Sequence, residues 1–185
     1  MLTFKYVILS FTLLAGLVAS APIADLSDEV ELFVRTPPNG AGPAKGMAQA
    51  VNIARQIKSS VKPEKDKAVF WSGTKQDASG KTVSVNKDAQ TFAKSNGKET
   101  LNMALQKNNI KIPTQQQNPQ SNRVWDMASK TFATRASGKT DAVLGGAVRK
   151  DSVWNRVEKP ALMKNDKVTQ VTEHNKQSGS SKVTK

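Results

Sequence analysis

The sequence predicts a single, compact domain of mixed α/β class. Apolar residues at three- and four-residue spacing, typical of amphipathic helices, alternate along the chain with short apolar runs typical of buried strands. The chain has 185 residues, a length that suits one hydrophobic core better than two domains. No internal repeat is visible in it.

The first 20 residues are expected to form a secretory signal peptide. Lys5 is their only charged residue, an apolar run follows it, and the segment ends in the small residues Ala19 and Ser20, with a further small residue, Ala21, directly after them. This order is the one that signal peptidase recognises, and we expect cleavage after Ser20. The apolar run is shorter than the roughly 20 residues of a membrane anchor. We therefore expect a secreted, extracellular protein that has no membrane association once the leader is removed.

The first half of the mature chain is predicted to contain an arm, two helices and a strand. Residues 21–43 are rich in proline and glycine, which predicts a turn-rich N-terminal arm before a domain that we expect to end at residue 173. Helical spacing predicts an amphipathic helix over 44–59, and an apolar run predicts a buried strand over 67–73. A second helix is expected around 89–97. Residues 100–105 fit a strand and a helix equally well, so their conformation stays open.

A polar loop over 113–122 is expected to lead into the most regular helix of the chain. Ser121 is a candidate cap for that helix. The helix is expected to present an apolar stripe, to carry Trp125 beside this stripe and to end at Gly138. The members of the stripe are Val124, Met127, Ala128, Thr131 and Phe132.

The last part of the chain is predicted to be mainly extended. We expect a strand over 142–148, a second extended piece over 152–158 and a strand over 168–172. Residues 174–185 are polar, and we predict a disordered tail there.

Composition excludes several kinds of chemistry. The chain has no cysteine and a single histidine, His174, so Cys-His and Ser-His-Asp catalysis are disfavoured, as is a cysteine metal site. The formal net charge is +13, but the basic residues are spread over the chain. This distribution predicts a solvated basic surface, suited at most to polyanions or a cell wall, and disfavours nucleic acid as a partner.

The three tryptophans, Trp71, Trp125 and Trp154, are the main candidates for a binding site. Core packing explains tryptophans at such positions, and so does a clamp that stacks on a flat, electron-poor ring. Glu158 lies four residues after Trp154 and has the same two interpretations, an ion pair on the surface or a reactive carboxylate. The residue pattern alone leaves both alternatives open.

Four segments in order resemble the ADP-ribosyl cyclase family of NAD-consuming ectoenzymes and its relatives among secreted toxin domains. Phe70-Trp71-Ser72 is similar to a Trp-Ser element of the family, and Thr100–Leu105 to its Thr-Leu-Glu-Asp-Thr-Leu element. Val124–Ala133 is similar to the helix with the second active-site tryptophan. Ser152–Glu158 is similar to a Ser-Thr-Phe-x-x-Val-Glu element that ends in the catalytic glutamate.

The resemblance implies a small central, mainly parallel sheet with flanking helices, and a reaction. Glu158 would be the catalytic carboxylate of an enzyme that splits NAD into nicotinamide and ADP-ribose, with some cyclic ADP-ribose. NAD is then a substrate, and neither a cofactor nor a metal is required. The substrate-binding residues implied are Trp71, Ser72, Asn102, Trp125, Ser129 and Trp154.

The chain departs from the family at three points. Asn102 stands where the family usually has a glutamate that influences product choice, and Gly73 stands where some members have an arginine. Phosphate contacts are then expected from backbone amides or from Arg149, Lys150 or Arg156. The lack of cysteine places the chain nearer the toxin-like relatives, which are mostly NAD glycohydrolases. The rival interpretation is a non-catalytic secreted effector or polyanion-binding protein; the sequence identifies no inhibitor and no host target.

Overall fold

The computed structural model describes residues 46–185. The predicted signal peptide over 1–20 and the predicted arm over 21–43 lie outside the described residues. Within 46–185, no helix combines the length and the apolar character needed to cross a membrane.

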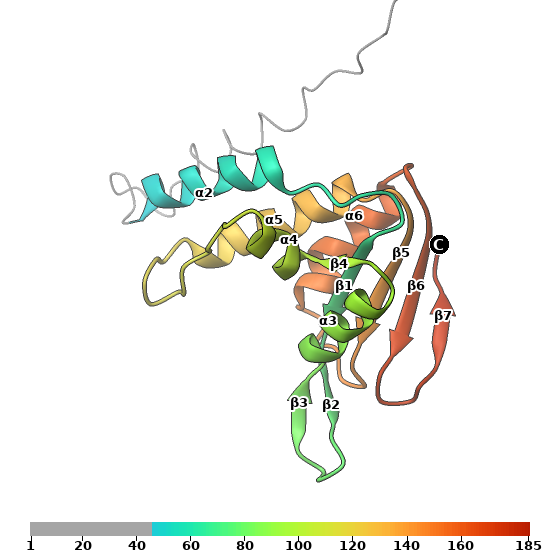
Figure 1. Ribbon diagram of the computed structural model, residues 1–185. Coiled ribbons are helices and arrows are strands. Elements are labelled where there is room, and N and C mark those ends of the chain that lie inside the picture. Colours follow the sequence, from blue (N-terminus) through green and yellow to red (C-terminus); the bar gives the residue numbers. More distant parts are fainter. Residues whose placement is uncertain (1–45) are drawn as a thin grey trace, which may run out of the picture.

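A five-stranded sheet forms the centre of the domain (Figure 1). Its strand order is β4-β1-β5-β6-β7, and the first four of these strands are parallel while β7 runs antiparallel to β6. The bounds are Ala68–Ser72 for β1, Glu99–Thr100 for β4, Gly138–Leu144 for β5, Val168–Asn175 for β6 and Ser181–Val183 for β7. The mixed α/β class with a mainly parallel central sheet, predicted from the sequence and the resemblance, is confirmed.

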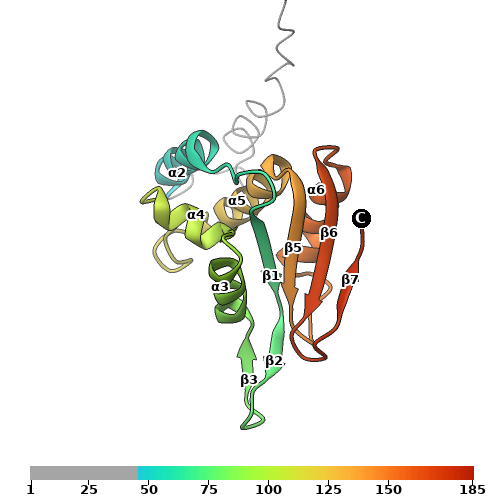
Figure 2. The same ribbon diagram turned by 45° about the vertical axis from the view of Figure 1, so that its right-hand side comes forward.

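A small hairpin extends from the end of β1. It consists of β2, Thr74–Gln76, and β3, Thr82–Ser84, which pair antiparallel to each other. Figure 2 shows the hairpin projecting beyond the lower edge of the main sheet.

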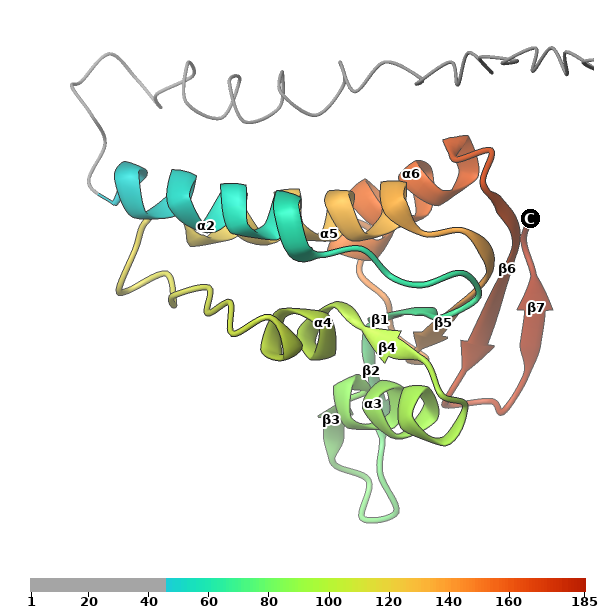
Figure 3. The ribbon, with the colours of Figure 1, turned by 45° about the horizontal axis from the view of Figure 1, so that its top comes forward.

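Helices cover both faces of the sheet (Figure 3). The helices are α2, Met47–Ser60; α3, Asn86–Ser95; α4, Leu101–Lys107; α5, Ser121–Arg135; a π-helical segment η1, Trp154–Glu158; and α6, Lys159–Lys164. Phe70 of β1 packs in one core cluster with residues of α2, α5 and α6, whereas Val69 packs in a second cluster with α3. Successive residues of a strand point to opposite faces, so α3 covers one face and α2, α5 and α6 cover the other.

Several predicted elements are present where the sequence placed them. The helix expected over 44–59 is α2, and the strand expected over 67–73 is β1. Residues 100–105, left open, contain both conformations: Thr100 ends β4, and its hydroxyl accepts a hydrogen bond from Met103 N at 3.3 Å, which caps α4. One residue therefore closes the strand and begins the helix, which explains why both patterns overlap there.

The helix that carries Trp125 is confirmed, but its ends differ from the prediction. It ends at Arg135, and Gly138 starts β5, so the strand expected over 142–148 begins four residues earlier and ends at Leu144. Ser121 is the first residue of α5 and does not cap it. Its hydroxyl donates instead to the carbonyls of Thr114 and Asn118, which fixes the preceding loop.

Residues 153–158 are helical, so the extended piece predicted over 152–158 is wrong. Ser152 Oγ accepts a hydrogen bond from Asn155 N at 3.3 Å, as a helix-capping residue does, and η1 continues directly into α6. Pro160 lies in the first turn of α6, and the wider π-helical turn comes directly before it.

The polar end of the chain is ordered in the structure, so the prediction of a disordered tail is also wrong. The strand β6 continues to Asn175, and β7 pairs with it. The ammonium group of Lys185 donates to the carbonyls of Leu162, Met163 and Asn165 at 3.0, 3.1 and 2.8 Å. Polar composition does not predict these contacts, because the pairing of β7 with β6 and the hydrogen bonds of Lys185 are made to backbone atoms.

Candidate functional site

A cavity of about 700 Å³ opens at the carboxyl ends of β1 and β5. After β1 the chain passes to α3 on one face of the sheet, and after β5 it passes to η1 and α6 on the other face. Two neighbouring parallel strands whose connections diverge in this way leave a crevice between them, where open α/β sheets bind ligands.

Glu158 provides the carboxylate of this cavity. It is the last residue of η1, and only 7% of its surface is exposed. Burial raises the pKa of its carboxyl group from 4.5 to about 7, while a hydrogen bond from the Ser129 hydroxyl opposes part of this rise. A carboxyl group with such a pKa exchanges a proton near neutral pH, as reactive acids and bases do.

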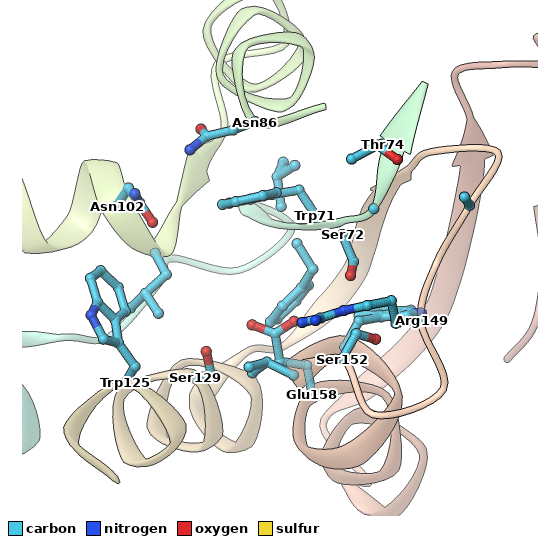
Figure 4. A pocket seen from close by; sticks show the side chains of 17 residues that line it. Trp71, Ser72, Thr74, Asn86, Asn102, Trp125, Ser129, Arg149, Ser152 and Glu158 are labelled. Carbon is cyan, nitrogen blue, oxygen red and sulfur yellow. The ribbon is translucent and has the colours of Figure 1, made fainter. Parts of the chain in front are cut away.

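Two tryptophans border the cavity from different elements. Trp125 and Ser129 lie four residues apart on α5, so they share one face of that helix, and both line the cavity. Trp71 enters from the end of β1, where it is partly exposed and also packs against the α3 cluster. Figure 4 shows the Trp71 side chain opposite Glu158, and the Trp125 side chain at another edge of the cavity, on the helix that carries Ser129.

Asn102 and Ser72 complete the set of residues that the sequence predicted. Asn102 lies in the first turn of α4 beside Trp125, and Ser72 is the last residue of β1. Both line the same cavity as Glu158.

Trp154 differs from the other two tryptophans. Its side chain is 1% exposed, and its ring centroid lies 5.9 Å from that of Phe70 in the main core. It reaches the cavity as part of the wall. This geometry favours the core interpretation for Trp154 and leaves Trp71 and Trp125 as the accessible aromatic surfaces.

The structure adds residues to the site that the sequence did not single out as contacts: Thr74, Asn86 and Ser152 line the cavity. Arg149, one of the three basic residues that the sequence offered for phosphate contacts, lines it too. Thr74 is the first residue of β2 and Asn86 the first residue of α3, and no local pattern in the sequence connects them. A second cavity of about 370 Å³ shares Asn102 and Trp125 with the first.

Other titratable groups lie away from this cavity. His174 Nε2 contacts Asp141 Oδ1 at 2.7 Å, and its Nδ1 contacts Ser181 Oγ at 2.9 Å, while Lys98 pairs with the other oxygen of Asp141. None of these four residues lines the cavity. Within residues 46–185, no group of three or more His, Asp or Glu side chains is placed to hold a metal ion.

No family model matches the chain, and no curated protein matches it. Several solved structures are similar. One is an Aplysia cyclase complexed with substrate NGD and product cGDPR, at 18% identity over 79% of this chain and 71% of that chain, with a TM-score of 0.46. Porcine CD38 complexed with a covalent intermediate is 20% identical over 69% of each chain, with a TM-score of 0.44. The apo structure of porcine CD38 is 18% identical over 82% of this chain and 80% of that chain, with a TM-score of 0.40. Values this low do not identify an activity, which has to be argued from the site.

Proposed function

We propose that the protein cleaves the bond between nicotinamide and ribose in NAD, giving nicotinamide and ADP-ribose, with some cyclic ADP-ribose. The observation that carries this proposal is the buried carboxyl group of Glu158 in a cavity bordered by Trp71 and Trp125. The same proposal treats NAD as a substrate and places the reaction outside the cell, in keeping with the predicted signal peptide.

A single carboxylate is sufficient for this reaction. The bond to the ribose breaks with its electron pair going to the pyridinium nitrogen, so nicotinamide leaves as a neutral molecule and needs no proton. An ordinary glycosidase uses a second carboxyl group to protonate its leaving group. Ionised Glu158 stabilises the positive charge that develops on the ribose, and the Ser129 hydroxyl holds this carboxylate in place. Water then adds to the same carbon and releases a proton.

The aromatic residues and Asn102 suit the leaving group. A pyridinium ring is flat and positively charged, and an indole face attracts such a ring more strongly than the faces of Tyr and Phe do. Asn102 can donate to and accept from a carboxamide, and it lies beside Trp125. Nicotinamide is therefore placed at the end of the cavity formed by α4 and α5.

The proposal is tested by incubating the protein with NAD and with its fluorescent etheno analogue. Released nicotinamide, ADP-ribose and cyclic ADP-ribose are separated by chromatography. Glu158→Gln should lower the rate by roughly 1000-fold, because it removes the charge that stabilises the transition state. Glu64→Gln removes an exposed carboxylate far along the chain and serves as the matched control. A wild-type protein that releases no nicotinamide disproves the proposal, and a fully active Glu158→Gln variant disproves the role of this residue.

The net charge of +13 supports a second candidate, a non-catalytic protein that binds polyanions or cell wall. This alternative expects tight binding to heparin that weakens steeply with salt, together with no turnover of NAD. Turnover of NAD that depends on Glu158 rules it out.

A further inference from the structure

We propose that Arg149 binds the diphosphate of the dinucleotide and thereby selects NAD over substrates that contain the same scissile bond without phosphate. This inference rests on the proposed function and specifies the substrate class. Among the described residues that line the cavity, Arg149 is the only one with a positive charge. In Figure 4 its side chain points into the cavity from the loop that follows β5, at the end away from Asn102 and Trp125.

The loop that carries Arg149 is fixed against the end of β1. Gly145 N donates to Ser72 O at 2.9 Å, and Thr74 N donates to Ala147 O at 3.1 Å. The approach is so close that a Cβ atom on Gly73, whose φ is +89°, would lie 2.5 Å from Ala147 O. The missing side chain at Gly73 therefore allows the loop to close on β1, which brings Arg149 to the cavity.

The Arg149 guanidinium is available for a ligand. Its side chain is 82% exposed, and its Nε lies 3.7 Å from Oδ1 of Asp151, which is also exposed. Such surface pairs contribute little free energy and exchange readily for a better partner. A guanidinium group donates two parallel hydrogen bonds to a phosphate, which gives strong, oriented binding.

Arg156 is not available in the same way. Its two terminal nitrogens each donate to one carboxylate oxygen of Asp126 at 2.7 Å, so its bidentate face is occupied. Neither Arg156 nor Lys150 lines the cavity. Of the three basic residues considered from the sequence, the geometry selects Arg149.

The arrangement also gives the substrate a direction. Trp125 and Asn102 lie at one end of the cavity, Glu158 near its middle and Arg149 towards the other end (Figure 4). In NAD the nicotinamide, the ribose carbon that reacts and the diphosphate follow one another in this order. One bound orientation therefore satisfies the aromatic walls, the carboxylate and the cation together.

The test compares substrates that differ only in phosphate. With Arg149→Gln, we expect KM for NAD to rise by about 10- to 100-fold, the loss typical of a hydrogen bond to a charged group, while kcat at saturation changes little. The ratio kcat/KM for nicotinamide riboside, which has the same scissile bond and no phosphate, should stay within about twofold, because Arg149 does not touch it. Arg149→Lys keeps the positive charge but cannot donate two parallel hydrogen bonds to a phosphate, so its KM for NAD should lie between those of the wild type and of Arg149→Gln.

Lys150→Gln is the matched control, because it removes one positive charge from the next position of the same loop. It should leave KM for NAD within about twofold, since Lys150 is exposed, does not line the cavity and is screened by solvent. Equal losses for NAD and for the riboside in Arg149→Gln would show a structural role and overturn the proposal. Equal rises of KM for NAD in Arg149→Gln and Lys150→Gln would show that only the overall positive charge matters, and would overturn the proposal as well.

Binding separates this inference from the proposed function. ADP-ribose is titrated calorimetrically into the Glu158→Gln protein with and without Arg149→Gln. A loss of affinity of about tenfold or more on removing Arg149 supports the inference even if the wild-type protein fails to hydrolyse NAD. Unchanged affinity overturns the inference while leaving hydrolysis through Glu158 intact.

Discussion

Replacing Glu158 by glutamine should remove most of the activity and at the same time stabilise the protein. The carboxyl group is buried, and its pKa in the folded chain is about 7, against 4.5 in an exposed chain. Folding therefore favours the protonated form, and ionising the buried group costs free energy. Glutamine has nearly the same shape as the protonated acid and avoids this cost.

The size of the effect follows from the shift of the pKa. Because the folded-state value is the higher one, the contribution of Glu158 to stability is greatest at low pH and is lost as pH rises from about 4.5 to about 7. Relative to Glu158→Gln, the wild-type free energy of unfolding should be equal near pH 4, lower by about 1 kcal/mol at pH 5, and lower by about 3 kcal/mol above pH 8. The last figure corresponds to a melting temperature about 10 °C higher for the variant.

The assay is thermal or urea unfolding of both proteins from pH 4 to pH 9, beside Glu64→Gln. Glu64→Gln should not reproduce the pH-dependent gain in stability, because the Glu64 carboxylate is exposed to water in the folded protein as well as in the unfolded chain. A Glu158→Gln protein that is no more stable than wild type at pH 8, or a gain of equal size at all pH values, would refute the argument from burial.

Three further outcomes are expected. The ratio kcat/KM for NAD should rise about tenfold per pH unit up to about pH 7, because Glu158 reacts when ionised. Ser129→Ala should move the midpoint of this pH profile upward, because it removes a hydrogen bond to the carboxylate. A flat pH profile contradicts both predictions. Trp154→Ala should lower the free energy of unfolding by about 3–5 kcal/mol, measured in urea, since it opens a cavity in the core; a stable variant that loses only affinity for NAD would contradict the core role. Deleting residues 176–185 should cost about 2 kcal/mol, because it removes β7 and the hydrogen bonds of Lys185; a truncated protein with an unchanged melting curve would mean that this segment stabilises nothing.

The strongest prediction from the sequence was the helix that carries Trp125 and Ser129. Its apolar stripe faces the core, and four-residue spacing places these two residues on one face beside that stripe. The position of Glu158 in the same cavity was expected only from the order of motifs. Local periodicity does not show which helix lies opposite the end of which strand. The hydrogen bond between Ser129 and Glu158 could therefore be seen only in the structure.

The wrong predictions share a physical cause. Over 152–158, Val153, Trp154 and Val157 favour a strand locally, but capping by Ser152 and packing of Trp154 on Phe70 produce a helix. In the tail, pairing with β6 supplies order that a polar composition does not predict. In both cases contacts distant in the sequence override the local preference.

The two charged groups of the cavity come from one short segment, and this bears on how the site works. Arg149 O accepts hydrogen bonds from Ser152 N at 3.1 Å and from Asn155 Nδ2 at 2.8 Å, and Ser152 O accepts one from Arg156 N at 2.9 Å. These bonds join the backbone at Arg149 to the helical segment that ends in Glu158. The reacting carbon and the diphosphate of a dinucleotide are likewise separated by a short, fixed series of bonds. The backbone that carries the cation is thereby tied to the helix that carries the carboxylate, so a diphosphate bound by Arg149 would lie at a set place relative to Glu158 and help to position the reacting carbon.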